Sequence, residues 1–366
     1  MKVGIAGTRG IPNNYGGFEQ FAEYLAVGLV ERGVEVWVYN SHDHPCREKL
    51  WKGVNRIHCY DPEGTIGVAG QFLYDLNCIA DSRKRNFDIL LQLGYTSSSV
   101  WHRLLPKGAR IITNMDGMEW QRSKYHPLVR RFLKHAEKLA VNSSDLLIAD
   151  AEPIRDYLDL TYHVHSRYIA YGAEVFETPD PACLQPYQVS PGAYFLVIAR
   201  MQPDNHIEEV IRGVLRSGTD YPLLVVGNVK NGHGAMLVKK YASDQVRFLG
   251  GIFRKEDLNQ LRHFSRLYFH GHSAGGTNPS LLEAMAAGAP VCAHDNPFNR
   301  SVLGDDASFF ADEGQLAALI SSPGEEMNRD LMKWNNMEKI KMKYSWNSII
   351  DEYFRAFADE LGKSTV

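Results

Sequence analysis

Short apolar runs alternate with longer segments of helical periodicity along this chain, and the alternation is interrupted once. A parallel sheet covered by helices gives this pattern, because its strands are buried on both faces and each is followed by a crossover helix. In the first half, strands are expected at residues 3–6, 34–39, 56–60, 89–93, 110–113, 146–149 and 168–170. After the interruption, strands are expected at residues 194–199, 223–226, 246–249, 267–270, 290–293 and 308–311. The sequence therefore predicts two doubly wound, Rossmann-like α/β domains.

The interruption lies between Gly172 and Gly192 and is rich in proline, which is typical of a linker. At 366 residues the chain is longer than one hydrophobic core usually organises. We expect a first domain over residues 1–172, a linker over 173–192 and a second domain over 193–344. Residues 345–366 carry one apolar helical stripe, formed by Ile349, Ile350, Tyr353, Phe354 and Phe357. This stripe predicts a C-terminal helix that packs back on the first domain.

Composition narrows the classes of partner and compartment. The formal net charge is −3, so charge gives no reason to expect nucleic acid as a partner. The five cysteines are scattered and never spaced as Cys-x-x-Cys, which favours reduced thiols in a cytoplasmic enzyme. No apolar run approaches the ~20 residues of a membrane span. We expect a cytoplasmic protein whose contact with a membrane, at its inner face, would be peripheral.

A glycine-rich turn follows the expected strand at residues 267–270 and leads into a short helix that carries Glu283. Backbone N–H groups of Gly275, Gly276, Thr277 and Asn278 would lie at the helix N-terminus, where they and the helix dipole favour phosphate. Glu283 is placed to accept hydrogen bonds from ribose hydroxyls, or else it only complements the helix dipole. Arg200 ends another strand, where its guanidinium could clamp a diphosphate. These residues predict a site for a nucleotide diphosphate.

In the first half, a long glycine-rich loop follows the first strand, and Gly16 and Gly17 stand immediately before the next helix. Such a pair allows a charged ligand to approach the backbone closely. The alternative is that the glycines are needed only because a flexible loop adopts positive φ angles there. The loop lacks the G-x-G-x-x-G spacing of a dinucleotide fingerprint. This makes a nicotinamide dehydrogenase a distant alternative.

Two carboxylates and two cations follow the expected strand at residues 110–113. Asp116 is our first candidate to accept the proton of an attacking hydroxyl and Glu119 the second, while Arg122 and Lys124 suit an acceptor phosphate. Asp-Gly is also an ordinary turn, and Asp an ordinary helix cap. The segment therefore predicts an acceptor site, with a purely structural turn as the alternative.

The surrounding segment, residues 103–138, is strongly basic. It holds nine Lys and Arg against three Asp and Glu, an excess of six positive charges. Apolar residues alternate with these cations at helical spacing, at Leu128, Phe132, Leu133, Ala136 and Leu139. A helix of this kind can bind anionic lipid, or it can simply cover a sheet with its apolar stripe. The sequence leaves both readings open.

Metal ligands are not evident in the sequence. No His, Cys or Asp cluster has the spacing of a zinc site, and Asp-x-Asp does not occur. We expect no metal and no other cofactor. His270 and His272 flank the glycine turn, where they could donate to phosphate or be structural.

The order of these motifs resembles that of glycosyltransferase family 4, retaining enzymes of the two-domain GT-B fold, over nearly the whole chain. The resemblance rests on Gly16–Gly17, on residues 199–201 and on residues 279–291. Residues 7–19, 116–120 and 275–279 more closely resemble a subgroup of bacterial rhamnosyltransferases that build capsule and cell-wall polysaccharides. This implies transfer of rhamnose from dTDP-rhamnose, a nucleotide sugar, to a lipid-linked or saccharide acceptor, with retention of anomeric configuration. Arg200 would stabilise the leaving diphosphate.

Two departures from the wider family bear on this expectation. The family's first paired glutamate would fall at Gly275 and its usual diphosphate-binding lysine at Asn205. Loss of the glutamate favours a 6-deoxyhexose donor within the resemblance. Loss of the lysine leaves Lys230, Arg254 or Lys255 as possible replacements. The two departures also keep open a non-catalytic subunit that binds a nucleotide sugar, and a sugar-nucleotide epimerase is a further alternative.

Overall fold

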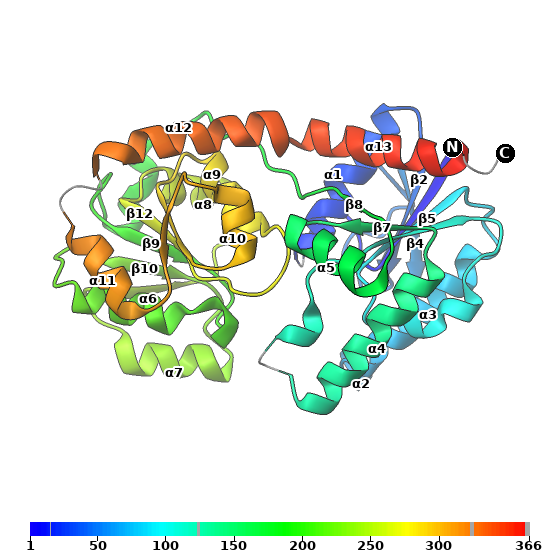
Figure 1. Cartoon of the computed structure of the whole chain (residues 1–366), viewed down its shortest axis with the longest axis horizontal. Coiled ribbons are helices and arrows are strands. Elements are labelled where there is room, and N and C mark those ends of the chain that lie inside the picture. Colours follow the sequence, from blue (N-terminus) through cyan, green and yellow to red (C-terminus); the bar gives the residue numbers. More distant parts are fainter. Residues whose placement is uncertain (15, 123–124, 323–325, 363–366) are drawn as a thin grey trace. The chain divides into compact units, whose positions relative to one another are not determined.

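The computed structural model describes residues 1–14, 16–122, 125–322 and 326–362 of the chain. It divides into two compact units (Figure 1). The first comprises Met1–Gln121, Tyr125–Tyr171 and Trp346–Val366, and the second comprises Arg122–Lys124 and Gly172–Ser345. Each unit has its own parallel sheet with helices packed on it, as expected from the alternation of apolar runs.

The sheet of the first unit has the strand order β3-β4-β2-β1-β5-β6-β7-β8. Its strands are β1 (Lys2–Ala6), β2 (Glu35–Ser41), β3 (Leu50–Trp51), β4 (Val54–Cys59), β5 (Ile89–Leu93), β6 (Arg110–Asn114), β7 (Leu146–Ala149) and β8 (Ser166–Tyr168). Every pairing is parallel except that of β3 with β4. The expected strands are all present, with ends shifted by one or two residues. The sequence missed β3, because this two-residue edge strand has no apolar run.

The helices of the first unit lie on both faces of its sheet. They are α1 (Gly17–Glu31), α2 (Glu63–Ile66), α3 (Ala69–Ser82), α4 (Pro127–Ser143), α5 (Glu152–Tyr162) and α13 (Trp346–Gly362), with the 3-10 turns η1 (Ser99–Leu104) and η2 (Glu119–Gln121). Figure 1 shows α1 and α13 on one side of the sheet and α3 and α4 on the other. Right-handed crossovers produce this arrangement where the strand order runs outward in both directions from β1 and β5.

The C-terminal helix packs on the first unit, as its apolar stripe predicts. Tyr353 and Phe357 are fully buried, and the ring of Tyr353 lies 5.3 Å from that of Phe21 in α1. At Gly28 the two helices approach so closely that a Cβ would collide with Ile350. The amide of Asn114, the last residue of β6, donates to the Tyr353 hydroxyl at 3.0 Å. The last helix in sequence is therefore part of the first unit's core.

The second unit has a six-stranded, fully parallel sheet in the order β11-β10-β9-β12-β13-β14. Its strands are β9 (Phe195–Ile198), β10 (Leu223–Val226), β11 (Val246–Gly250), β12 (Leu267–His270), β13 (Val291–His294) and β14 (Ser308–Phe310). Its helices are α6 (Ile207–Arg216), α7 (Gly232–Tyr241), α8 (Lys255–His263), α9 (Pro279–Ala286), α10 (Pro297–Leu303), α11 (Glu313–Ser321) and α12 (Glu326–Lys343). Two 3-10 turns, η3 (Pro181–Tyr187) and η4 (Pro203–Asn205), complete it.

Candidate active site

The strand order of the second unit reverses between β9 and β12. From β9 the chain moves outward to β10 and β11, whereas β12, β13 and β14 extend the sheet in the other direction. In open parallel sheets, ligands bind beyond the carboxyl ends of the strands at such a switch point. Arg200 follows β9, and the glycine turn follows β12. The fold therefore brings the residues expected to bind the diphosphate to one edge of this sheet.

The glycine turn has the backbone geometry of a helix-terminal anion site. Gly275 has φ of +121°, a conformation that other residues rarely adopt. Asn278 caps α9, and its side chain accepts a hydrogen bond from the Ser280 N–H at 2.9 Å. Thr277 is buried, while Gly275, Gly276 and Asn278 are half-buried. Since Asn278 already satisfies the Ser280 donor, an anion here would use the N–H groups that precede Ser280.

Asn205, which stands where the wider family has a lysine, has a structural role in this loop. Its side chain is buried and donates to the Arg200 carbonyl at 2.7 Å. The backbone N–H of Gln202 donates to the same carbonyl, also at 2.7 Å. The Arg200 side chain is exposed beyond this turn. The amide thus shapes the backbone that carries Arg200, at a position where a lysine would have to be buried.

Glu283 lies in the second turn of α9, so it is not the first-turn residue that would only complement the helix dipole. Its Oε2 accepts a hydrogen bond from Arg262 Nη2 at 2.6 Å. Arg262, in α8, is only 1% exposed. A buried guanidinium paired at this distance fixes the carboxylate strongly. Sequence reasoning missed Arg262, although a cation at an inward position of a short helix is a signal in its favour.

Burial disfavours the charged form of both histidines beside the turn. Their rings stack at 4.4 Å between centroids, and His270 is fully buried. Burial holds the pKa of His270 well below its usual range. Burial, followed by the charge of Arg200, lowers the pKa of His272 to about 3. Neither imidazole is therefore a cation for a phosphate at neutral pH, which favours the structural reading for His270.

In the first unit, the acidic segment directly follows β6. Asp116 is half-buried, has φ of +50°, and donates its backbone N–H to Asn114 Oδ1 at 2.9 Å. Residues other than glycine adopt this left-handed conformation uncommonly, and such residues concentrate at functional sites. Glu119 begins η2 and accepts a hydrogen bond from the Tyr125 hydroxyl at 3.2 Å. Both carboxylates thus lie in one loop at the carboxyl edge of this sheet.

Of the two cations expected to bind an acceptor phosphate, the structure describes only Arg122. Arg122 is half-buried and clusters with the second unit. Lys124 lies outside the described residues, as does Tyr15 of the first loop.

A buried carboxylate, Glu137 of α4, anchors the acidic segment. Its Oε1 accepts from the Tyr157 and Tyr162 hydroxyls at 2.6 Å each and from Lys134 Nζ at 2.9 Å. Its Oε2 accepts from Trp120 Nε1 at 2.9 Å. The Lys134 ammonium also lies 4.4 Å from the Trp120 ring centroid. Trp120 belongs to η2, so Glu137 holds the turn that carries Glu119 against α4 and α5. No sequence pattern indicated this network.

The loop after β1 is organised by a second buried carboxylate, Glu19 in α1. It accepts from the Arg9 backbone N–H at 2.7 Å and from the Thr8 hydroxyl at 3.2 Å. Gly16, which caps α1, is extended with φ of −167°, so it does not serve a positive φ. The positive φ values in this loop belong to Gly7, at +89°, and Gly10, at +120°. The loop is therefore an ordered turn in which Gly16 is half-buried and Gly17 is exposed at the N-terminus of α1.

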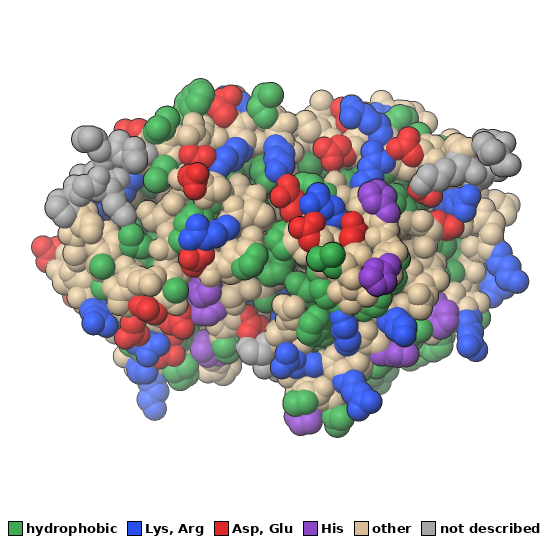
Figure 2. All heavy atoms as spheres, viewed as in Figure 1, with side chains coloured by type: hydrophobic (Ala, Val, Ile, Leu, Met, Phe, Trp, Pro, Cys, Tyr) green, Lys and Arg blue, Asp and Glu red, His purple; other side chains and the backbone are tan. Residues whose placement is uncertain are grey.

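The apolar stripe of α4 is buried at one end and exposed at the other. Leu133 and Ala136 pack inward, whereas Leu128 is 71% and Phe132 38% exposed. Figure 2 shows Lys and Arg side chains gathered over this helix. Among the described residues, no helix is long and apolar enough to cross a membrane. Packing against the first unit therefore explains the apolar residues in the C-terminal half of α4, but not those in its N-terminal half.

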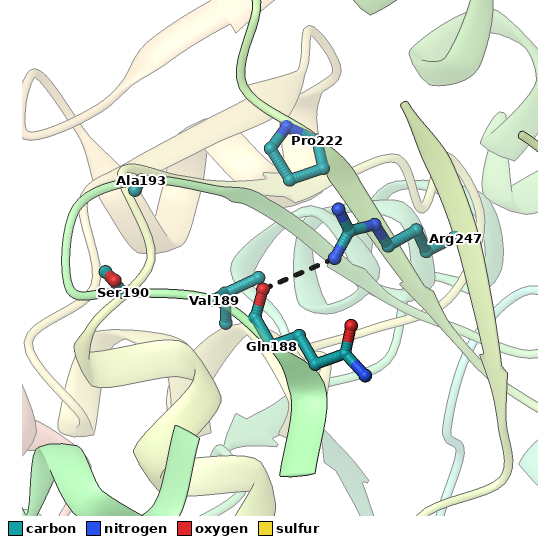
Figure 3. Close-up of a pocket in the computed structure, with 6 residues that line it drawn as sticks. All are labelled: Gln188, Val189, Ser190, Ala193, Pro222 and Arg247. Atoms are coloured by element: carbon teal, nitrogen blue, oxygen red, sulfur yellow. Dashed lines mark hydrogen bonds between the residues drawn. The ribbon is translucent and has the colours of Figure 1, made fainter. Parts of the chain in front are cut away.

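A hollow of about 450 Å³ lies at the opposite edge of the second sheet, before the strands begin (Figure 3). Arg247 in β11 crosses it and donates to the Gln188 carbonyl at 3.4 Å. The other lining residues are Val189, Ser190, Ala193 and Pro222. Because Pro222 precedes β10, this hollow lies at the amino ends of the strands and is separate from the candidate site.

Residues 188–333 match the family model described as glycosyl transferases group 1, and residues 1–174 match a domain of unknown function (DUF1972). No curated protein matched the sequence. Among solved structures, sucrose-phosphate synthase from Thermosynechococcus elongatus has a TM-score of 0.80 at 15% identity, over 99% of both chains. HepE from Anabaena, in complex with UDP-glucose, has a TM-score of 0.73 at 13% identity, over 98% of this chain and 99% of that one.

A glycosyltransferase from Rickettsia africae has a TM-score of 0.71 at 14% identity, over 98% of both chains. Structural similarity at this level of identity shows the fold alone. The match of residues 188–333 to glycosyl transferases group 1 is independent of it, because that match rests on sequence. The expected pair of doubly wound domains is confirmed as the GT-B fold. Together, the group 1 match over residues 188–333 and this fold support glycosyltransferase activity for the chain.

Proposed function

We propose that this glycosyltransferase moves rhamnose from dTDP-rhamnose to a hydroxyl of a lipid-linked or saccharide acceptor, with retention, in bacterial polysaccharide synthesis. The observation that carries the proposal is the convergence of Arg200, the 275–278 turn and Glu283 at the β9/β12 switch point. A guanidinium, backbone N–H groups and a fixed carboxylate match a diphosphate and a ribose, respectively. HepE, which shares the fold, has been solved with UDP-glucose.

The donor half works by electrostatic stabilisation. As the bond between sugar and diphosphate breaks, negative charge grows on the leaving phosphate, and Arg200 with the N–H groups of the turn stabilises it. The Gly16–Gly17 backbone is proposed to contribute from the first unit. Glu283, held by Arg262, receives the ribose hydroxyls. No metal is assigned to the diphosphate in this scheme.

The sugar preference rests on Gly275. A glutamate at φ of +121° would be strained, so the backbone of this turn is built for glycine. The site then lacks the carboxylate that family 4 uses to bind donor hydroxyls. A 6-deoxyhexose presents one hydroxyl fewer than a hexose, so its binding is expected to be weakened least by the missing carboxylate. Together with the resemblance of residues 7–19, 116–120 and 275–279 to rhamnosyltransferases, this supports rhamnose.

The acceptor half is proposed to lie at Asp116 and Glu119, with Arg122 and Lys124 for an acceptor phosphate. Asp116 would take the proton of the attacking hydroxyl. The exposed Leu128 and Phe132, beside Arg130 and Arg131, would rest on anionic lipid at the inner face of the cytoplasmic membrane, at about 1 kcal/mol per cation near the surface. Such contact would bring a lipid-linked acceptor within reach of a cytoplasmic enzyme.

The test is turnover of the purified chain with a panel of UDP-, GDP- and dTDP-sugars and a lipid-diphosphate sugar acceptor. Rhamnosyl transfer from dTDP-rhamnose is expected, and Arg200→Ala should lower turnover by about 100-fold or more, as for loss of one oxyanion donor. Arg247→Ala, at the amino edge of the same sheet, is the matched control and should leave turnover unchanged. Transfer from another donor alone would refute the sugar assignment, while binding of nucleotide without any turnover would identify a non-catalytic subunit.

The acceptor role is tested separately with Asp116→Asn and Glu119→Gln. Asp116→Asn should abolish transfer while leaving dTDP affinity unchanged, because the carboxylate acts on the acceptor. Unchanged transfer by Asp116→Asn, with loss in Glu119→Gln, would move the role to Glu119.

A further inference from the structure

Two histidines and a glutamate meet in the second unit, although His294 is far in sequence from His206 and Glu209. His206 precedes α6, Glu209 lies in its first turn, and His294 ends β13. One nitrogen or oxygen of each side chain lies within 4.8 Å of the corresponding atoms of the other two. His206 Nε2 and Glu209 Oε2 are 4.0 Å apart, too far for a hydrogen bond. The three groups therefore surround a common point without satisfying one another.

The ligand atoms of this cluster are available. The ring of His206 is oriented by its Nδ1, which lies 2.8 Å from the Gly271 carbonyl oxygen. Donation from Nδ1 leaves Nε2 with its lone pair, which is the arrangement that metal-binding histidines adopt in proteins. Glu209 Oε2 is shielded from solvent and has no hydrogen-bond partner. A shielded carboxylate oxygen without a partner is costly unless a cation or donor occupies the site.

The third group can also turn toward an ion. The amide of Asn296 lies 3.3 Å from His294 Nδ1, but it also donates to the carbonyls of His272 and His294 at 3.1 Å each. Its two hydrogens are thus satisfied without the imidazole. His294 can therefore present a ring nitrogen to a ligand without leaving this amide unpaired.

We propose that His206, Glu209 and His294 form a binding site for a divalent transition-metal ion of the zinc class. Two imidazoles and one carboxylate are a known three-ligand set for Zn²⁺, with a fourth position open to water or a ligand. Bonds of about 2.0–2.1 Å would bring the ligand atoms to roughly 3.4 Å from one another. The stacked rings of His206 and His294, now 4.1 Å apart between centroids, would then part to about 5 Å.

This site would join the start of α6 to the end of β13. Through His206 it also touches Gly271, the first residue after β12 and the beginning of the turn that leads to Gly275. A bound ion would rigidify this edge of the sheet. The inference rests on the three ligands alone and does not depend on which sugar, or whether any sugar, is transferred.

The experiment is titration of full-length, tag-free protein, freed of metal by chelation, with Zn²⁺ by calorimetry and with Co²⁺ by visible absorption. One ion per chain is expected, with the d–d bands of tetrahedral Co²⁺. Loss of an outer partner of a metal site costs about 10–100-fold in affinity, so His206→Ala and His294→Ala should each cost at least about 100-fold. Glu209→Gln should also weaken binding. His165→Ala, at an exposed position in the first unit, is the matched control and should bind as the wild type does.

Thermal unfolding separates loss of the site from loss of the fold. Zn²⁺ should raise the Tm of the wild type and of His165→Ala, because the ion binds only the folded state. The ligand variants should show no rise in Tm when Zn²⁺ is added, whatever their Tm without metal; His206→Ala also loses the hydrogen bond to the Gly271 carbonyl. Failure of the wild type to take up Zn²⁺ or Co²⁺, or equal affinity in wild type and ligand variants, would overturn the proposal.

Discussion

Glu137 offers the sharpest test of how the first unit holds its acidic loop. The side chain is 2% exposed, and its two oxygens accept hydrogen bonds from five donors, on Tyr95, Trp120, Lys134, Tyr157 and Tyr162. Glu137→Gln keeps the shape but leaves one acceptor oxygen instead of two. In the less costly orientation the glutamine NH₂ group faces the Trp120 N–H and the Tyr95 hydroxyl. The hydrogen bond from Trp120 is then lost, whereas the Tyr95 hydroxyl can turn to accept one.

The expected cost follows from these contacts. One hydrogen bond to a charged acceptor contributes about 1.5–3 kcal/mol. The hydrogen bonds that remain are weaker as well, because their acceptor is now a neutral amide oxygen instead of a carboxylate. Lys134 is 37% exposed, so its ion pair is screened by solvent and adds little. We expect Glu137→Gln to destabilise the first unit by about 2–4 kcal/mol, with the loss centred on η2, α4 and α5.

The assay is native-state hydrogen exchange of peptides from α4 and α5, because a chain with two units need not unfold in one step. Asp156→Asn, which removes an ion pair with Arg155 on the surface of the same unit, is the matched control and should cost less than ~1 kcal/mol. If these peptides were as well protected from hydrogen exchange in Glu137→Gln as in the wild type, the argument that this carboxylate holds Trp120 would be wrong.

Three further predictions concern single side chains. Burial raises the pKa of Asp75 to about 6, so folding favours its protonated form, and the free energy of unfolding should fall as pH rises from about 4 to 6. At pH 7, urea unfolding of Asp75→Asn should show a free energy of unfolding up to about 3 kcal/mol higher than that of the wild type. Gly7→Ala should cost more than ~2 kcal/mol by the same measurement, because φ is +89° and a Cβ would collide with the Leu93 carbonyl. Asn205→Lys should lower both stability and turnover, since it buries a charge and removes the bond to the Arg200 carbonyl, whereas higher turnover would mean the site lacks a cation.

Much of the fold was predictable because its signals are local. Each apolar run long enough to be buried became a strand, and the proline-rich break falls where the second unit begins. The two-residue β3 was missed, since its Leu50 is 58% exposed at the sheet edge and contributes no buried run. The expected strand at 168–170 is observed as Ser166–Tyr168, because Ile169 and Ala170 are buried as the chain leaves the sheet.

The candidate site was predictable in its motifs and not in its partners. Arg200 and the glycine turn could be placed together because parallel strands end at one edge of a sheet. The pairing of Glu283 with Arg262 was not visible, since helix orientation about its axis decides which side chain faces which. The same holds for Glu137, whose donors come from three separate elements.

The sequence by itself determined two doubly wound domains and the chemistry available at the ends of their strands. Periodicity and glycine positions record these features directly, because burial and backbone conformation are properties of short segments. Only the tertiary structure decided that Asn205 is a structural amide, that Leu128 and Phe132 are exposed, and that His206, Glu209 and His294 meet. Such outcomes depend on how loops and side chains pack in the folded chain, and no local pattern records which side chains become neighbours.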